Sequence, residues 1–338
     1  MKISIAIIAV VLVVAAASLA STVFAPLALA LFIIALVWPV QSWLQARISK
    51  LPALAVTIVT TLAIGLALAS MAAWGFGRVG GSFFADAARY QSIYDGIVTW
   101  LDGHGVSVAG LWAEHFNVRW LLRTTQYVTG RVNTTLTFWL IALVYVTLGL
   151  LEVDDLRLKI AALDNPEAAR VLLNGSAAAA EKLRRYMLVR TQMSALTGVF
   201  VGAFAGISGL QFAIEWGVIA FTLNYIPYIG PFIATLFPTL LAMTQFDSWA
   251  SVVIVFVCLN VIQFVIGSYI EPRFAGNVLA ISPLVVLFAT LFWTFLWGLF
   301  GTFIGVPIAL AALSFCGQHP SSRWIADLLG GPSLKKTG

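Results

Sequence analysis

Charged residues are scarce in this chain. Of its 338 residues, 10% are Asp, Glu, Lys or Arg and 61% are hydrophobic, whereas a soluble domain carries about 25% charged residues. Residues 1–51 contain only Lys2, Arg47 and Lys50, and residues 274–322 contain no charged residue. A bilayer-spanning helix needs about 20 mostly apolar residues. The composition therefore excludes a soluble fold and predicts an all-α polytopic membrane protein.

Residues that usually carry chemistry are also few. Cys258 and Cys316 lie inside apolar runs, which is typical of small buried side chains rather than of a disulfide or a metal pair. His104, His115 and His319 are too far apart to form a metal site. The sequence has no phosphate-binding glycine loop or Ser/His/Asp arrangement, and no basic stripe with interleaved aromatic residues. We expect no enzymatic activity, no cofactor and no nucleic-acid partner.

The N-terminus resembles a secretory signal peptide, with Lys2, an apolar run at residues 3–17 and small residues at 18–20. A second apolar run at residues 22–41 follows directly after Ser21. A pair of spanning helices explains both runs, so we expect the first helix to remain uncleaved.

The runs without charge predict about eight transmembrane helices. They cover residues 3–20, 22–41, 53–76, 134–151, 191–209, 216–244, 249–270 and 283–315. The third is expected to end at Gly75-Phe76-Gly77. The predicted organisation begins with three transmembrane helices in 1–77. Extramembrane (periplasmic) interfacial helices follow in 78–133, with a turn at 102–105, and a fourth span lies at 134–151. The rest is a charged cytoplasmic segment at 152–190, a C-terminal transport half at 191–316 and a cytoplasmic tail at 317–338.

Lys and Arg predict the orientation, because cytoplasmic loops carry an excess of both. Residues 152–190 contain seven Lys or Arg and six Asp or Glu. An N-terminus inside the cell also places Arg47, Lys50 and the Lys335-Lys336 tail inside. Both termini are therefore expected in the cytoplasm.

Two of the late apolar segments are interrupted by glycine and proline. Asn224-Tyr225-Ile226-Pro227-Tyr228-Ile229-Gly230-Pro231 divides the first, and Trp297-Gly298-Leu299-Phe300-Gly301, followed by Gly305 and Pro307, divides the second. Proline removes a backbone donor and clashes with the preceding turn. Such pairs of interrupted segments indicate a transport site, and a kink that only shapes packing is the alternative. Whether residues 283–315 cross once or fold back as a re-entrant hairpin stays open.

Four charged residues lie between residues 191 and 322: Glu215, Asp247, Glu271 and Arg273. A charge at the bilayer centre costs about 2.5–3.5 kcal/mol on insertion scales. Glu215 and Asp247 fall where segments turn, so we expect them at the interface.

Glu271 and Arg273 flank Pro272, at the end of a segment that also carries Asn260 and Gln263. One hypothesis is a local Glu271–Arg273 pair that caps the helix. The other is a gate or a protonatable coupling group.

Glycines repeat at short intervals in two segments. Gly198, Gly202 and Gly206 share one helix face, and Gly298, Gly301 and Gly305 could do the same. Such spacing lets a second helix approach closely and indicates helix packing or subunit assembly.

Residues 224–234, 270–276, 281–286 and 297–307 resemble the motifs of the AI-2E family of bacterial inner-membrane transporters. The last motif departs from the family, because bulky aromatic residues stand where the family tends to place Gly-Pro-x-Gly. The resemblance implies an all-helical transporter of about eight spans in the bacterial inner membrane, assembled as a homo-oligomer, with pentamers as the family's architecture. Family members are linked to export of the signal autoinducer-2 or to sodium–proton exchange.

We therefore expect a secondary transporter for a small polar solute or ion, surrounded by membrane lipid. The expected substrate path is Asn224, Tyr225, Pro227, Tyr228, Gly230, Pro231, Asn260 and Gln263, with Glu271 and Arg273 for coupling or gating. A membrane scaffold that docks a partner through residues 152–190 is the rival hypothesis. An intramembrane hydrolase would need a paired nucleophile and base, which the spans do not show.

Overall fold

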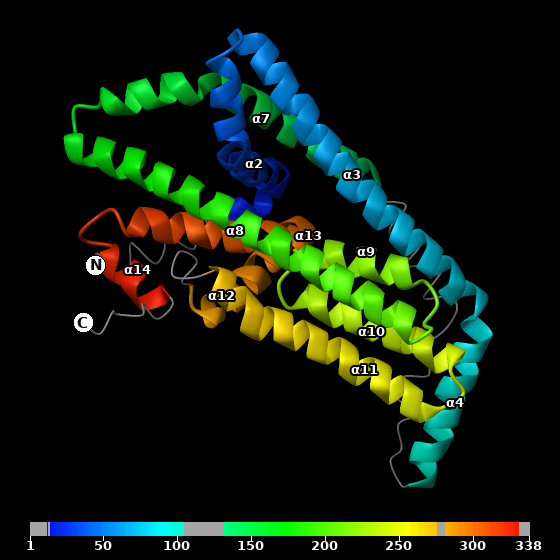
Figure 1. Cartoon of the computed structure of the whole chain (residues 1–338). Helices are drawn as coiled ribbons and strands as arrows, with labels where there is room; N and C mark the ends of the chain where they lie inside the picture. Colours follow the sequence, from blue (N-terminus) through cyan, green and yellow to red (C-terminus); the bar gives the residue numbers. More distant parts are fainter. Residues whose placement is uncertain (1–11, 13, 105–131, 276–280, 331–338) are drawn as a thin grey trace.

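The computed structural model describes residue 12 and residues 14–104, 132–275 and 281–330. These ranges are almost entirely helical and contain no β-strand, which confirms the predicted all-α fold (Figure 1). By length and composition, six of the described helices can cross a membrane. The predicted first span lies mostly outside the described residues.

The first half of the chain forms long helices. They are α2 (Ser21–Gln45), α3 (Lys50–Ala85), α4 (Ala87–Gly103) and α7 (Val132–Ala161). The expectation that the third helix ends at Gly75-Phe76-Gly77 is wrong, because α3 continues to Ala85. A helical glycine costs only about 1 kcal/mol relative to alanine. At Gly75 the missing side chain leaves room for Ile219, whose Cγ1 would lie 3.2 Å from an added Cβ.

Helix α4 lies in the region predicted to be extramembrane, and it ends beside the predicted turn at 102–105. It packs onto the rest of the molecule through Tyr90. The Tyr90 ring stacks on Phe83, with centroids 5.2 Å apart, and Thr244 Oγ1 lies 3.4 Å from its phenol oxygen. Burial raises the pKa of the Tyr90 phenol above its ordinary value.

The charged segment 152–190 is not a separate unit, because helices continue across both of its boundaries. Its first part extends α7 to Ala161, and its second part is the first half of α8 (Pro166–Ile207). Asn165 caps α8, since its Oδ1 accepts hydrogen bonds from the Glu167 and Ala168 amides at 3.0 and 3.1 Å. Lys, Arg and Glu are good helix formers, so charge alone does not end a helix here. We call these two extensions the α7–α8 arm.

The first interrupted segment is a helical hairpin. It consists of α9 (Ala213–Leu223) and α10 (Ile229–Gln245), which confirms the predicted break. Gln245 Nε2 donates to Gly209 O at 2.6 Å, and Gln245 Oε1 accepts from the Gln211 amide at 2.8 Å. The end of α10 therefore lies beside the start of α9. We call α9 and α10 the first hairpin.

The second interrupted segment also folds back. This segment is α13 (Pro283–Cys316). Before it come α11 (Trp249–Phe264), a π-helical turn η1 (Val265–Ile270) and α12 (Glu271–Ala275). The short helix α14 (Arg323–Leu329) follows it.

Within α13, Gly298 has φ 62° and ψ −142°, a conformation available essentially to glycine alone. The hydroxyl oxygens of Thr294 and Thr302 lie 2.7 Å apart. A Cβ on Gly305 would lie 2.8 Å from Ala289 O, although a straight helix would separate these residues by about 24 Å. Residues 283–297 and 299–316 are thus two arms of a second hairpin, which answers the question that the sequence left open.

The two hairpins open at opposite ends of the bundle (Figure 1). At one end Lys50 Nζ donates to Leu151 O at 2.6 Å. At the other end Arg78 Nε lies 3.0 Å from Glu215 Oε1, and Arg89 lies 3.5 Å from Asp247. Glu215 is in the first turn of α9 and Asp247 lies between α10 and α11, so both occur where segments turn, as expected.

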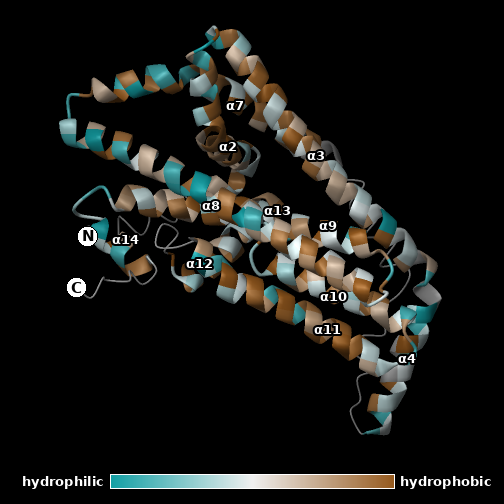
Figure 2. Cartoon of the chain, in the orientation of Figure 1, coloured by the Kyte–Doolittle hydropathy of each residue, from teal (hydrophilic) through white to brown (hydrophobic). Residues whose placement is uncertain are grey.

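Helix α8 is the shared support of both hairpins. The stripe of Gly198, Gly202 and Gly206 lies against α9, and a Cβ on Gly198 would be 2.7 Å from Gly217 O. The second arm of α13 packs against the other half of α8, where Ile304 and Leu310 join a hydrophobic cluster with Leu183 and Tyr186. Hydrophobic residues cover α2, α11 and α13, whereas hydrophilic residues gather on the α7–α8 arm (Figure 2).

Candidate functional site

The tip of the first hairpin is held against the middle of α8. Asn224 is 6% exposed, and its Nδ2 donates to Ser194 Oγ at 3.3 Å. The Tyr225 hydroxyl donates to Thr191 Oγ1 at 3.0 Å. Two polar side chains of the tip therefore pair with two polar side chains on successive turns of one helix.

The tip backbone departs from helical geometry because of its sequence. Tyr228 has φ 62°, which is uncommon for a residue with a side chain and costs about 1–3 kcal/mol. Gly230 packs so closely that an added Cβ would overlap the Leu223 carbonyl. Pro231 stands in the first turn of α10, where no backbone donor is needed. The Tyr228 hydroxyl donates to Pro283 O at 3.2 Å, which joins the tip to the second hairpin.

A half-buried ion pair lies on the same part of α8. Arg190 Nη1 is 3.1 Å from Glu271 Oε1 and 3.2 Å from Oε2. The side chains are 11% and 26% exposed, and the Arg190 guanidinium lies 5.8 Å from the Tyr186 ring centre. Within the described part of the chain, Arg190 Nε has no hydrogen-bond partner. The pair thus keeps an unused donor in a place where unpaired polar groups are costly.

These groups together form what we call the junction site. Its members are Tyr186, Arg190, Thr191, Ser194, Asn224, Tyr225, Tyr228 and Glu271. The site lies along α8 between the stretch covered by α9 and the stretch covered by α13. It offers a guanidinium, a carboxylate, an amide and several hydroxyls, which suits the binding of a small polar molecule. No group of three or more His, Cys, Asp or Glu that could hold a metal occurs among the described residues.

Comparison with known proteins gives the family. The sequence profile of the AI-2E family transporters matches residues 5–320. The chain belongs to this family. It is 31% identical over 208 residues to the putative transport protein YhhT of Escherichia coli K12, which covers 61% of this chain and 58% of YhhT. It is 32% identical over 151 residues to the AI-2 transport protein TqsA of the same strain, which covers 45% of this chain and 44% of TqsA.

A protein of a second bacterium gives a similar match. The chain is 34% identical over 128 residues to the putative transport protein YrrI of Bacillus subtilis, which covers 37% of this chain and 35% of YrrI. The chain thus matches less than two thirds of the length of each of these relatives. As a member of a transporter family with many apolar helices, it is a multi-pass membrane protein.

In this AI-2E family member, some of the residues predicted for the path lie outside the junction site. Asn260 is exposed, and its Nδ2 donates to Phe256 O of its own helix at 2.8 Å. Gln263 is half-buried, with an Nε2 that has no partner among the described residues. Pro227 and Pro231 shape the tip without offering a polar side chain.

The hypothesis of a local Glu271–Arg273 pair is wrong. Glu271 pairs with Arg190, whereas Arg273 Nη2 donates to the Tyr269 hydroxyl at 2.6 Å and its guanidinium stacks on that ring at 3.9 Å. Residues two apart on a helix do not face each other. The six-residue π-helical turn η1 ends directly before Glu271, and such turns are frequent at functional sites.

Sequence reasoning missed Arg190, because it grouped this residue with the charged segment 152–190. A signal was available: Arg190 stands between the apolar residues 187–189 and the weakly polar run that begins at Thr191. The other glycines that were singled out belong to the second hairpin. Gly298 forms its turn, and Gly301 and Gly305 lie against Trp293 and Ala289 of the opposite arm.

Proposed function

We propose that this AI-2E family protein is a secondary transporter or facilitator that moves a small polar solute through the junction site. The observation that carries the proposal is the half-buried Arg190–Glu271 pair, placed where the broken backbone of the first hairpin meets α8. Ionisable residues inside apolar helices are costly and mark substrate or ion pathways.

The broken backbone supports the same conclusion. Non-helical backbone at membrane depth is tolerated only where protein or a watery cavity satisfies its polar groups. Discontinuous helices with such breaks form the binding sites of many secondary transporters. A signal molecule similar to autoinducer-2 is our proposed cargo, since TqsA is named an AI-2 transport protein. Export is its proposed direction by resemblance to the family. The Arg190 and Asn224 donors and the Glu271 carboxylate can pair with hydroxyl and carbonyl groups of such a solute.

Sodium–proton exchange is a second candidate, favoured by Glu271. It is the acidic member of the junction site, and a carboxylate can exchange a proton for a cation. Arg190 lies close enough to replace either ion as the partner of Glu271 when the site is empty. A dependence of flux on a pH gradient distinguishes this candidate from simple solute export.

We also propose an orientation and an assembly. The bundle end that carries Arg47, Lys50 and the α7–α8 arm has more basic residues and belongs in the cytoplasm by the positive-inside rule. Because both hairpins fold back, residues 317–330 lie at this same end, where His319 is 4.0 Å from Glu167 of the α7–α8 arm. The proposed membrane is the bacterial inner membrane. Subunit assembly as a homo-oligomer, with five copies by family resemblance, completes the proposal.

Flux measurements in proteoliposomes test the proposed function. We expect Glu271→Gln, Arg190→Gln and Asn224→Ala each to reduce autoinducer-2 or sodium flux at least ten-fold, measured with and without a pH gradient. Asp247→Asn is the matched control, because this carboxylate also pairs with an arginine but at an exposed site. Wild-type flux in all three variants would contradict the site. Loss of function only when the α7–α8 arm is altered would favour the scaffold instead.

A further inference from the structure

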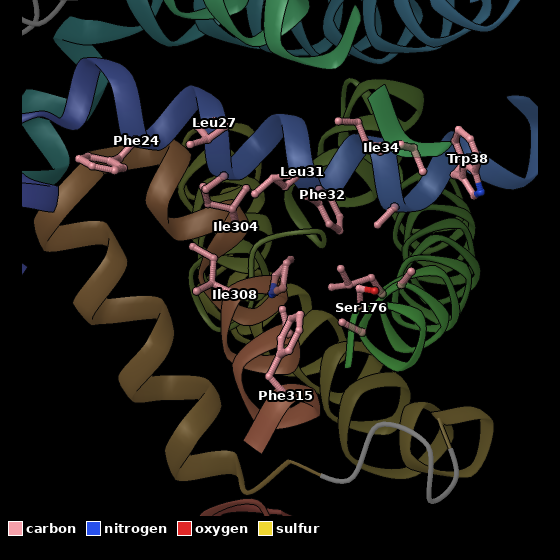
Figure 3. Close-up of a pocket in the computed structure, with 18 of the residues that line it drawn as sticks. Phe24, Leu27, Leu31, Phe32, Ile34, Trp38, Ser176, Ile304, Ile308 and Phe315 are labelled. Carbon is pink, nitrogen blue, oxygen red and sulfur yellow. The ribbon is translucent and has the colours of Figure 1, made fainter. Parts of the chain in front are cut away.

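A long apolar pocket lies between α2, α7, α8 and both arms of α13, against the stretch of α8 that precedes the junction site. Its volume is about 740 Å³, within the range of about 300–1,000 Å³ that is usual for ligand sites. The pocket follows α2 from Phe24 to Trp38, with Ile304, Ile308 and Phe315 of α13 on the opposite wall (Figure 3). Phe24 and Trp38 are 14 residues apart, or about 21 Å along a helix.

The lining does not suit a small polar solute. Of the side chains that line the pocket, Arg157 is the only charged one and Ser176 the only one with a hydroxyl. A polar solute would lose its bonds to water there without replacement, which is unfavourable. The body of the natural occupant must therefore be apolar.

One end of the pocket is cationic. The Arg157 guanidinium lies 5.6 Å from the Trp38 ring centre, and Arg184 Nη1 donates to Ala35 O at 3.0 Å. Ala35 and Trp38 are neighbours on one face of α2, so both guanidinium groups lie near this end. Neither arginine makes a salt bridge within the part of the chain that the structure describes.

The acidic residues of α7 do not cancel this charge inside the pocket. Val153, Leu156, Arg157 and Ile160 line it, and this spacing is that of one helix face. Glu152, Asp154 and Asp155 of α7 are not among the residues that line it. The pocket thus combines a long apolar body with a positive mouth.

We infer that this pocket binds an anionic phospholipid. One acyl chain lies along α2 toward Phe24, and the phosphate pairs with Arg157 and Arg184. A length of about 21 Å accommodates the hydrocarbon of one leaflet, which is about 15 Å thick. Planar guanidinium groups bind phosphate oxygens with two parallel hydrogen bonds. Arg157 follows Leu151 by less than two turns, and Leu151 meets Lys50, so the mouth lies toward the end proposed to be cytoplasmic.

Lipid binding to the purified, delipidated full-length chain tests this inference. The ligands are phosphatidylglycerol and phosphatidylcholine with identical acyl chains, and glycerol 3-phosphate as a headgroup without acyl chains. Native mass spectrometry measures the binding of each. We expect wild-type protein to bind phosphatidylglycerol about ten-fold more tightly than phosphatidylcholine and not to bind glycerol 3-phosphate. The double variant Arg157→Gln/Arg184→Gln should abolish this preference. Ala180→Trp should weaken the binding of both lipids, because its larger side chain fills the pocket.

Arg185→Gln is the matched control, since Arg185 is the exposed neighbour of Arg184, whereas the hydrogen bond to Ala35 O of α2 is made by Arg184. It should keep the wild-type preference. Melting temperatures without lipid establish that each variant is folded. If the double variant does not fold, the single Arg157→Gln variant replaces it, because Arg157 is exposed. Equal binding of the two lipids by wild type, an unchanged preference in the arginine variants, or tight binding of glycerol 3-phosphate would overturn the inference.

Discussion

Arg190 and Glu271 are 81 residues apart in the chain, yet Arg190 Nη1 lies 3.1 and 3.2 Å from the two carboxylate oxygens of Glu271. The pair joins α8 to the end of the α11–η1–α12 segment. Because the pair is largely removed from solvent beside the tip of the first hairpin, each charged side chain is stabilised by the other.

Removing both partners should therefore cost less stability than the sum of removing each one alone. We expect Glu271→Gln to lower the free energy of unfolding by about 3–5 kcal/mol, since it leaves a buried guanidinium unpaired. The Arg190→Gln/Glu271→Gln double variant should lose less free energy of unfolding than the two single variants lose together. Reversible unfolding in mixed micelles measures all three.

The exposed pair at the other end of the bundle provides the control. Asp247→Asn should change the free energy of unfolding by about 0.5 kcal/mol or less, because surface ion pairs contribute little. Additive effects of the two substitutions at the buried pair would show that Arg190 and Glu271 do not interact.

The contact between Gly198 and Gly217 predicts a strong effect of one methyl group. A Cβ on Gly198 would lie 2.7 Å from Gly217 O and 2.9 Å from Phe221 Cβ, so Gly198→Ala must separate α8 from α9. We expect a destabilisation of about 1–3 kcal/mol. Gly65→Ala in α3 is the comparison, because nothing lies within 4 Å of its added Cβ. It should be neutral or stabilising by up to about 1 kcal/mol, as thermal unfolding would show.

Cysteine cross-linking tests the fold of α13. In a variant without Cys258 and Cys316, we expect Thr294→Cys/Thr302→Cys to form a disulfide on oxidation, because the two side chains are in contact. A continuous helix would place these residues about 12 Å apart. Ile254→Cys/Ile262→Cys has the same separation within α11 and should remain reduced. Gel mobility after proteolysis between the cysteines measures disulfide formation in each pair. Equal oxidation of the two pairs would argue against the hairpin.

The two hairpins also predict which side of the membrane each loop faces. We expect Ser321→Cys to react with a membrane-impermeant maleimide only in inverted vesicles, and Gln211→Cys only in intact cells. The reason is that the first hairpin opens at the end with Glu215, whereas the second opens at the end that carries Lys50. Labelling of both cysteines from one side would refute the proposed topology.

The sequence predicted the elements that depend on local chemistry. Runs without charge predicted the apolar helices, although not where α3, α7 and α8 begin or end. Pro227 and Gly230 predicted the break in the first hairpin, and Gly298 predicted that in the second. These residues act through their own backbone, so their effect is visible without knowledge of the fold. Gly75 shows the limit of such reasoning, since α3 passes through it and α9 packs against it.

The partner of Glu271 could not be predicted in the same way. Arg273 is nearby in sequence, but helix geometry points the two side chains apart. Arg190 comes close only because α11, η1 and α12 return beside α8. The apolar pocket has the same origin, because four helices that are distant in sequence form its walls.

The second hairpin is synthesised after α2 and α8, yet its side chains complete a cluster with both of these helices. Ile304 and Leu310 cover Leu29, Phe32 and Leu183. During translation, these earlier residues emerge and insert long before the side chains that bury them exist. The nascent protein must therefore present an uncovered apolar groove to lipid or to the insertion machinery. A chain truncated before Pro283 would retain that groove permanently, which makes it a natural target for membrane quality control.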